Sequence, residues 1–597
     1  MNKCVPLQRN KLFTAYGGVG SLIDTIDNLS IIVEPFDTWP YYDNLADHRE
    51  LLLEESRLLT MLRSIGFINL VGLFQPDVSL SDNQNFKPYR PSLNDRQTMV
   101  RTSFFPTWFY CRKCHRFMSL SEWEEKWTQT HDKKFRDYHP ACFDCGLHIG
   151  GGKYRRPRLQ QTRFVLASLD SGEIIDVPWK KVFAKHKQGR SDSNNASVWN
   201  FDIKTDESST VYYKESNDST NLSRIYVENE YHDKVFLSEI FKHYFVIGGK
   251  SYRLVVRSES NVYYAYNVNS VYIPRHVFTN DEINRIGCIY RLAPNNPNTL
   301  EQIRRNLGID CSVQEIETLI ENDFNYTPPR YTSEADFRKE EFKLLTDVRN
   351  YNNGVYVSPD NVSLISNEYI FKDIAEKPRF INTIFYQTRL KVTSAQVAYS
   401  RIEKISSDVI NDWQGQNNPP KLWYNINTDC EDDNVQVKLH PTCKQDISEL
   451  ERMMALSSYG EGFLVEMDLN YIIEPSDKKT FLHTFCHLLM KEIEFVCGYP
   501  VASMSERLYT NENEQIYGFM IYSIGSSGGS FGGISSLFQD HRIEGLINNA
   551  IKRASDCSND PICSLEGGHC EACVYLPETT CEQFNNDLNR NLFNHYK

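Results

Sequence analysis

The strongest constraint on the fold is a crowd of cysteines in the last part of the sequence. Cys557, Cys563, Cys570, Cys573 and Cys581 fall close together, and two Cys-x2-Cys pairs lie far upstream, Cys111–Cys114 and Cys142–Cys145. The opening residues, MNKCVPLQRNKLF, lack the apolar core of a signal peptide, so we expect a cytoplasmic protein. Thiols stay reduced in the cytoplasm, where close cysteine pairs favour a metal over a disulfide.

Zinc is the metal that these spacings indicate, because it takes four tetrahedral ligands and two Cys-x2-Cys pairs supply them. The upstream cysteines have the spacing of a zinc ribbon. In the C-terminal set, Cys570 and Cys573 form the anchoring pair, and Cys557 and Cys563 complete the site most plausibly, which leaves Cys581 as a substitute or a neighbouring thiol. We therefore expect two zinc sites. The ribbon's metal can serve only to hold a small module together, or the same module can also contact a nucleic acid or a protein.

Length and composition indicate several folded domains. The chain has 597 residues, of which 40% are hydrophobic, enough for buried cores. A net charge of -13 argues against a surface that coats nucleic acid indiscriminately, and no apolar run is long enough to span a membrane. We predict a multidomain α/β (α+β) protein with a four-cysteine zinc ribbon and a C-terminal zinc-binding α/β domain. The expected divisions are an N-terminal α/β region (1–104), the ribbon (105–150), a basic segment with a polar insertion (151–222), a middle α/β region (223–475) and the C-terminal domain (476–597).

Hydrophobic periodicity predicts several elements. Leucines at helical spacing favour a helix over 48–65, and a second helix is expected over 476–496, ending at Gly498. A buried strand over 516–525, a glycine turn over 525–533 and a helix over 534–553 should follow, which is an α/β pattern. The Ser/Asn/Asp-rich stretch 188–222 is expected to be a mobile excursion.

One stretch is basic within this acidic chain. Between Lys153 and Arg190 there are ten basic and three acidic residues, with aromatic residues interleaved. Phosphate contacts need such charge and base stacking needs such rings, so this stretch is the candidate nucleic-acid surface. A solvated face that binds nothing is the alternative. The residues chosen as candidate contacts are Lys153, Arg155, Arg156, Arg158, Arg163, Lys180 and Lys181.

Two patterns resemble catalytic motifs, but each lacks a residue that the chemistry needs. His483 and His487 lie one helical turn apart, but Thr484 stands where a zinc protease needs its glutamate, which favours packing or hydrogen-bonding roles. Gly525-Ser-Ser-Gly-Gly529 matches the nucleophile pattern G-x-S-x-G, with Ser527 at the centre. No suitably spaced acid and histidine follow it, so a backbone turn is favoured. The sequence contains no G-x-x-x-x-G-K-[ST] motif, and a motor ATPase is not expected.

The C-terminal 120 residues resemble the domain that follows the motor in MrfA-type repair helicases. The matching segments are LHTFCHLLM, CGYPVASMSERLY, IYGFMIYSIGSSGGSFGG and the tail CSNDPIC…CEAC…PETTCEQFNNDLNR. The resemblance implies a metal role for the five cysteines of that tail, Cys557, Cys563, Cys570, Cys573 and Cys581. Further segments, among them QRNKLFTAYGGVGSLID, FPTWFYCRKC and YGEGFLVEMD, resemble the DrmB family of the DISARM anti-phage defence system.

The resemblance implies a subunit that is not itself a motor or an enzyme. It would pair with a separate DrmA-like helicase and help to engage or load on invading DNA, which it would contact directly or through the helicase. Two other hypotheses compete with this one. The first is a serine hydrolase centred on Ser527, and the second is an adaptor that binds only proteins.

Overall fold

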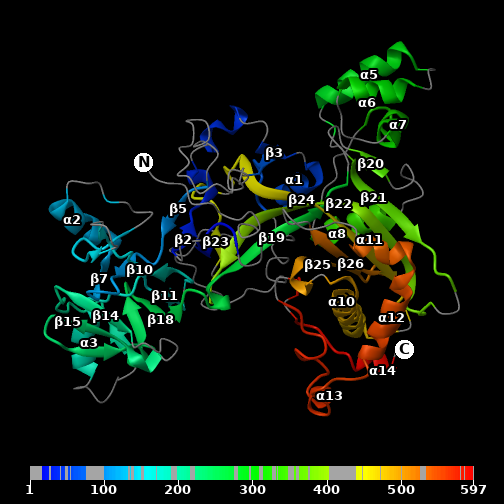
Figure 1. Cartoon of the computed structure of the whole chain (residues 1–597). Coiled ribbons are helices and arrows are strands. Elements are labelled where there is room, and N and C mark those ends of the chain that lie inside the picture. The colour runs from blue at the N-terminus through cyan, green and yellow to red at the C-terminus, as the bar shows by residue number, and fades with distance from the viewer. Residues whose placement is uncertain are drawn as a thin grey trace.

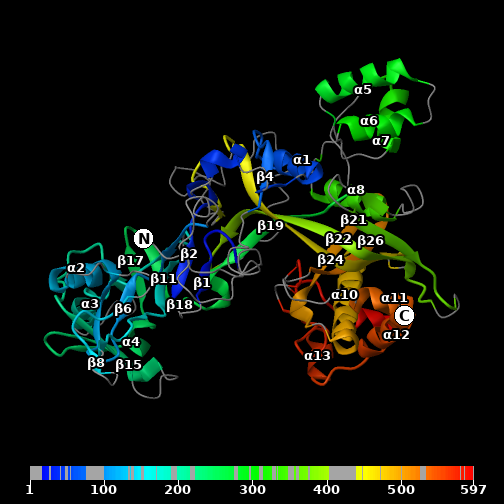
Figure 2. The same cartoon turned by 45° about the horizontal axis from the view of Figure 1, so that its top comes forward.

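The computed structural model describes most of the chain, with gaps. The described residues are 17–25, 29–39, 42–47, 51–53, 55–75, 100–131, 135, 140–148, 154–169, 171–189, 198–215, 222–273, 278, 280–294, 298–307, 313–325, 331, 334–346, 355–357, 362–373, 377–402, 439–446, 448–470, 472, 474–498, 500–524, 533–577, 580–583 and 585–595. Figure 1 shows two lobes joined by long strands, and Figure 2 shows the same division after rotation. The mixed α/β architecture predicted from the sequence is confirmed.

The first lobe, called the ribbon lobe (residues 105–256), is built on two sheets. The six-stranded sheet has the order β10-β6-β7-β14-β15-β16 and the five-stranded sheet has the order β12-β11-β18-β17-β13. The strands are β6 (Trp108–Tyr110), β7 (Arg116–Ser119), β10 (Gln160–Gln161), β11 (Phe164–Ser168), β12 (Ile174–Ile175), β13 (Val198–Asn200), β14 (Val211–Glu215), β15 (Ile225–Asn229), β16 (Lys234–Phe236), β17 (Tyr244–Ile247) and β18 (Lys250–Val256). A separate hairpin pairs β8 (Leu147–His148) with β9 (Tyr154–Arg155).

The ribbon lobe has one main core. Buried aromatic residues from all three predicted segments between 105 and 256 meet in it, including Phe117, Trp179 and Phe245. The helices of this lobe are α2 (Leu120–Thr130), α3 (Val182–Gly189) and α4 (Leu237–Ile240). Ser119 and Glu122 form a reciprocal capping box that starts α2.

The expectation of a mobile excursion over 188–222 is wrong for the described part of that stretch. Strand β13 pairs in parallel with β17, and β14 pairs with β7 and β15. Trp199 and Tyr213 are buried and anchor these strands in the core. The serine-rich composition of this stretch gave no sign of these two strands. They are stabilised because their aromatic residues are buried.

The N-terminal region packs between the lobes. Its elements are β1 (Leu22–Asp24), β2 (Ser30–Val33), β3 (Leu52–Leu53), α1 (Ser56–Ser64), β4 (Gly72–Phe74) and β5 (Thr102–Phe104). The helix predicted over 48–65 is therefore shorter than expected, because Leu52 and Leu53 pair with β4 as a strand. Residues 48–50 lie outside the described residues.

A large, mostly antiparallel sheet forms the second lobe. Its main path is β20-β21-β22-β24-β26-β25, and β4, β19 and β23 pair at its sides. The bounds are β19 (Tyr264–Val271), β20 (Val355–Val357), β21 (Val362–Tyr369), β22 (Ile381–Ser400), β23 (His440–Pro441), β24 (Arg452–Met467), β25 (Met504–Asn511) and β26 (Ile516–Ile524). Residues of β24 are buried over Gly460–Val465, as expected of a strand that is covered on both faces.

Helices cover both faces of this sheet. On one side lie α10 (Pro475–Cys497), α11 (Gly533–Gln539) and α12 (Arg542–Arg553), which form the largest core, and on the other lies α8 (Glu334–Thr346). Pro475 opens α10 one residue before the predicted start at 476, and Gly498, with a φ of 69°, ends it, as predicted. The helix predicted over 534–553 is broken in two at His541, whose φ is 57°. Short helices α13 (Ile562–Leu565) and α14 (Leu592–His595) complete this lobe.

A small helical module stands out from the second lobe in both views (Figures 1 and 2). It consists of α5 (Asn280–Leu292), α6 (Thr299–Leu307) and α7 (Val313–Glu321). Ile286, Ile303 and Ile316 form its own core. Among the described helices, none combines the length and the apolar composition that crossing a membrane requires.

Candidate metal centres

The upstream cysteines meet at one point of the ribbon lobe. Cys111 and Cys114 lie in the turn between β6 and β7, where the N–H of Cys111 donates to Arg116 O and the N–H of His115 donates to Cys111 O. His115, whose φ of 62° lies in the left-handed region, closes this turn. The Lys113 N–H points at Cys111 Sγ at 3.4 Å. An N–H directed at sulfur stabilises a thiolate, which is the form that binds a metal.

The second pair, Cys142 and Cys145, is held opposite by a short antiparallel pairing. The N–H of Cys142 donates to Pro157 O, and the N–H of Leu159 donates to Pro140 O. The ligand atoms of the four cysteines all lie within 4.8 Å of one another. An ion pair of 2.7 Å between Arg116 and Asp144 links the two turns. The geometry fits the four-sulfur zinc ribbon that the spacing predicts.

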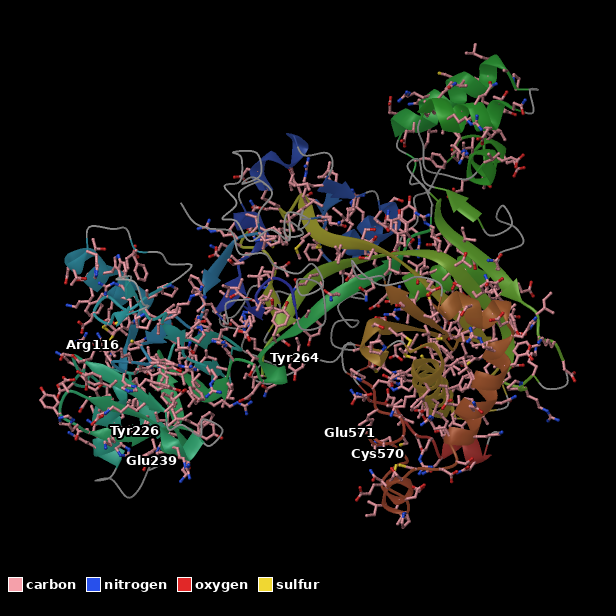
Figure 3. The ribbon with its side chains drawn as sticks, in the orientation of Figure 1. Arg116, Tyr226, Glu239, Tyr264, Cys570 and Glu571 are labelled. Carbon is pink, nitrogen blue, oxygen red and sulfur yellow. The ribbon has the colours of Figure 1, made fainter. Side chains whose placement is uncertain are left out.

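The C-terminal cluster consists of Cys557, Cys563, Cys570 and Cys573, the four cysteines that the sequence favoured. Their sulfurs also lie within 4.8 Å of one another, with 3.4 Å between Cys557 and Cys570 and 3.6 Å between Cys563 and Cys573. Figure 3 labels Cys570 at the edge of the second lobe, beside Glu571. Buried Arg590 ties the surrounding loops together, donating to Ala554 O at 3.1 Å and to Ser564 Oγ at 2.8 Å.

The electrostatics of this cluster favour a thiolate. Burial opposes ionisation of Cys570, but hydrogen bonds from Cys557 and Cys573 lower the pKa of its thiol to about 6. Four thiols this close repel one another once ionised, and a divalent cation relieves that repulsion. Because each cluster has four sulfur donors and no open position, a zinc ion there would be structural. These residues could bind it without taking part in a reaction.

Cys581 lies apart from the four-cysteine cluster. It joins His483, His487 and Glu506 in a third group whose ligand atoms lie within 4.8 Å of one another. The sequence shows that the two histidines lie one helical turn apart. Because no glutamate follows His483, this pattern alone favours packing or hydrogen-bonding roles. Glu506 was not singled out, because it lies on β25 and only tertiary structure brings it beside α10.

The basic side chains between Lys153 and Arg190 do not form one uniform surface in the structure. Lys153 lies outside the described residues, and only the backbone of Arg155 is described, in β9. The guanidinium of Arg156 donates to Phe143 O and Cys142 O, so this side chain supports the ribbon. Arg158 is exposed.

Several other cations of the stretch pair with acids from elsewhere in the ribbon lobe. Lys180 contacts Glu122, Lys181 contacts Glu207 at 3.2 Å, and Arg163 contacts Glu215 at 3.7 Å. The local excess of positive charge is therefore partly neutralised in the fold. Arg163 remains 47% exposed despite its partner.

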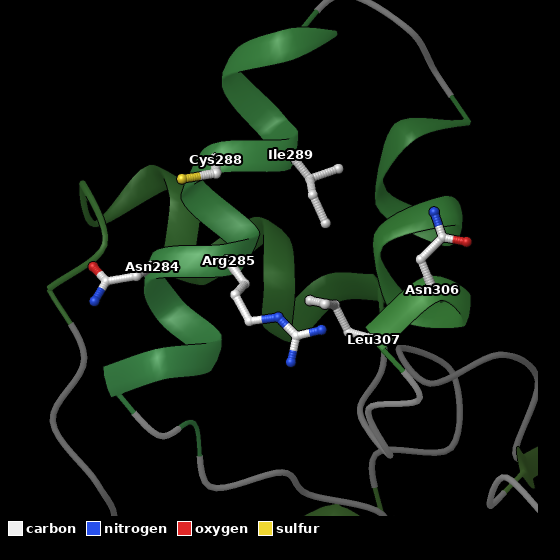
Figure 4. Close-up of a pocket in the computed structure, with 6 residues that line it drawn as sticks. All are labelled: Asn284, Arg285, Cys288, Ile289, Asn306 and Leu307. Carbon is white, nitrogen blue, oxygen red and sulfur yellow. The ribbon is translucent and has the colours of Figure 1, made fainter.

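Of the two catalytic patterns, the histidine pair lies in the group with Glu506 and Cys581 described above, and the serine pattern is not placed by the structure. Ser527 and the rest of 525–532 lie outside the described residues. His541 instead contacts the Tyr369 hydroxyl through Nδ1 at 2.8 Å. Figure 4 shows a hollow of the helical module that holds one thiol and one guanidinium but no paired acid and base. Its lining residues are Asn284, Arg285, Cys288, Ile289, Asn306 and Leu307.

Comparison with known proteins gives three results. Residues 8–264 match a family model described as a domain of unknown function, DUF8724. Over 138 residues the chain is 35% identical to the DISARM protein DrmB of Bacillus paralicheniformis, a match that covers 21% of this chain and 23% of that protein. The crystal structure of the DUF1998 helicase MrfA bound to DNA aligns over 41% of this chain and 26% of its own, with 8% identity and a TM-score of 0.21, too low to establish a common fold.

Proposed function

We propose that this chain is a non-motor, zinc-binding subunit of a DISARM-type anti-phage defence complex. The observation that carries the proposal is the 35% identity to a DISARM protein DrmB over 138 residues. The two four-cysteine clusters support the zinc-binding part of the proposal, because in each of them the four sulfurs lie within 4.8 Å of one another. The chain would act in the cytoplasm beside a separate DrmA-like helicase and help it to engage invading DNA.

Zinc has a structural role in this proposal. One ion would join the two turns of the ribbon through Cys111, Cys114, Cys142 and Cys145, and another would hold the C-terminal loops through Cys557, Cys563, Cys570 and Cys573. Small loop-rich modules bury too little apolar surface to fold firmly alone, and metal binding supplies the missing free energy. The ordered surfaces would then be available to the helicase or to DNA.

The chain has no enzymatic activity of its own in this proposal. ATP hydrolysis would come from the partner, since the sequence lacks a phosphate-binding P-loop. A DNA-stimulated ATPase assay of the isolated chain should give only background. The same assay on the complex should show turnover.

Co-purification with the helicase encoded beside this chain tests the proposal. We expect a stable complex that contains at least two zinc ions per copy of this chain. The Cys111→Ser variant should lose one ion, whereas Cys288→Ser, which changes an exposed thiol outside the clusters, should lose none. Failure to form any complex would reject the defence-subunit proposal, and a metal-free wild-type chain would reject the zinc role.

A further inference from the structure

Four buried side chains of types that can bind a metal converge from three separate segments, where α10 packs against β25 of the large sheet. His483 and His487 come from α10, Glu506 from β25, and Cys581 from the segment after the C-terminal cysteine cluster. His483, His487, Glu506 and Cys581 are 0%, 0%, 1% and 4% exposed. Burying so many ionisable groups is costly unless a specific interaction compensates for it.

The contact between the His487 ring and the Glu506 carboxylate is not explained by an ordinary hydrogen bond. Its Nδ1 lies 2.8 Å from Val574 O, and because a carbonyl oxygen can only accept, Nδ1 carries the proton. In the neutral ring, Nε2 then presents a lone pair, and it faces Glu506 Oε2 at 3.2 Å. Neither of these two buried atoms has a hydrogen-bond partner among the described residues. Two facing acceptors need a positive charge between them, which either a shared proton or a metal ion can supply.

The remaining contacts have the spacing of a shared coordination sphere. His483 Nε2 lies 3.1 Å from Glu506 Oε1 and 3.2 Å from Cys581 Sγ. Ligands about 2.0–2.3 Å from a tetrahedral zinc ion stand about 3–4 Å from one another. These separations are therefore suited to four atoms around one ion.

Surrounding backbone groups orient the donors as a metal site needs. The carbonyl of Val574 fixes the ring of His487, a common arrangement behind metal-binding histidines. The N–H of Glu582 donates to Glu506 Oε1 at 2.9 Å, and the N–H of Asn585 points at Cys581 Sγ at 3.2 Å. Both interactions favour the anionic forms that bind a metal.

We propose that His483, His487, Glu506 and Cys581 bind a third zinc ion, distinct from the ions of the two four-cysteine clusters. A set of two imidazoles, one carboxylate and one thiolate suits zinc, and four protein ligands leave no open position. The ion is structural and joins α10, β25 and the C-terminal segment. Val574, whose carbonyl contacts His487, directly follows Cys573. The third ion therefore also connects the C-terminal four-cysteine cluster to the buried side of α10.

Metal counting on the purified full-length chain tests this site. Inductively coupled plasma mass spectrometry should find about one zinc ion fewer per chain in Cys581→Ser than in the wild type. The matched control is Cys497→Ser, which makes the same change at a half-buried thiol at the end of α10, outside the cluster. That variant should keep the wild-type count. Near-ultraviolet circular dichroism would establish that each variant is folded.

The competing explanation is a metal-free ion pair, with His487 protonated beside Glu506. A folded Cys581→Ser variant with the wild-type zinc content would overturn the third site and favour that pair. If the variant does not fold, the wild-type chain decides the question. Three zinc ions per chain sustain the proposal, and two or fewer overturn it. Because Cys581→Ser leaves both four-cysteine clusters intact, this result is independent of whether the helicase complex forms.

Discussion

At the scale of single residues, buried charges connect the elements of the second lobe. Glu341 on α8 is fully buried, forms an ion pair with Arg507 and accepts a hydrogen bond of 2.6 Å from the Tyr509 hydroxyl. Burial opposes its ionisation, but the charges of Arg507 and Arg57 hold the pKa of Glu341 below its usual value. Such groups stabilise the fold only while every partner is present.

We expect Glu341→Gln to destabilise the second lobe by about 3–5 kcal/mol, because it leaves Arg507 buried beside a neutral partner. Chemical denaturation followed by intrinsic fluorescence would measure this loss. Glu514→Gln, which weakens a solvent-screened surface pairing with Lys339 and Lys343, should leave stability almost unchanged. Equal effects from the two variants would contradict the role assigned to Glu341.

Glu55 should make stability depend on pH. Burial raises the pKa of this carboxyl to about 7 from an ordinary 4.5. Below pH 4.5 it is protonated in both states. As pH rises towards 7 the unfolded chain releases its proton first, so the folded state loses up to about 3 kcal/mol. Glu55→Gln should remove that loss, so its melting temperature should exceed that of the wild type at pH 8 but not at pH 4.

Exposed Glu124 on α2 provides the matched control for this prediction. The Glu124→Gln variant should retain the pH dependence of the wild type. A wild-type melting temperature that does not fall between pH 5 and pH 8, relative to Glu55→Gln, would show that Glu55 is ionised in the fold.

At the scale of elements, the sequence predicted those with strong local signals. Helix α10 and strand β26 lie close to where periodicity put them, and the cysteine spacings predicted which eight thiols would form two groups. Local signals did not predict the break at His541, where the chain turns although apolar spacing continues. They also could not associate Glu506 with two histidines on another element, because tertiary pairing alone creates that contact.

Two glycines provide a matched test of how backbone conformation ends α10. Gly498 has a φ of 69°, whereas Gly545 lies within α12, and a methyl group at either position would meet no atom within 4 Å. Gly498→Ala should therefore cost about 1 kcal/mol through backbone strain. Gly545→Ala should stabilise the protein by about 0.5–1 kcal/mol through helix propensity. Thermal denaturation would compare the two, and effects of the same sign would contradict the role of the left-handed end.

At the scale of the whole molecule, an acidic protein must present its positive charge locally if it touches DNA. The predicted basic stretch folds into the ribbon lobe, and its cations divide into those that support the ribbon and those that remain exposed. Arg156 belongs to the first group and Arg158 to the second. The sequence could not separate these groups, since it does not show which acids fold back onto the stretch.

Reversing two of the exposed charges tests direct DNA contact. If Arg158 and Arg163 face phosphates, the double variant Arg158→Glu/Arg163→Glu should weaken binding and reduce the slope of log K against log salt by about 2. Arg305→Glu on the helical module is the control and should bind as the wild type does. Fluorescence anisotropy over a salt series would measure both. If the wild-type chain binds no DNA at low salt, direct contact is excluded and the adaptor hypothesis, in which only the helicase touches DNA, is favoured.

The length of β22 has a mechanical consequence. This single strand contributes Ile381 and Ile384 to the core around α10, Leu390 to the core beneath α8, and Ala395 to the core of the N-terminal region. Its 20 residues extend over about 65 Å and are paired on both sides for much of that length. Its pairing with β24 is interrupted by register shifts between Ile381 and Thr383 and between Gln387 and Leu390, where a bend disturbs the fewest hydrogen bonds. One continuous backbone segment therefore ties the N-terminal region to the helices on both faces of the large sheet.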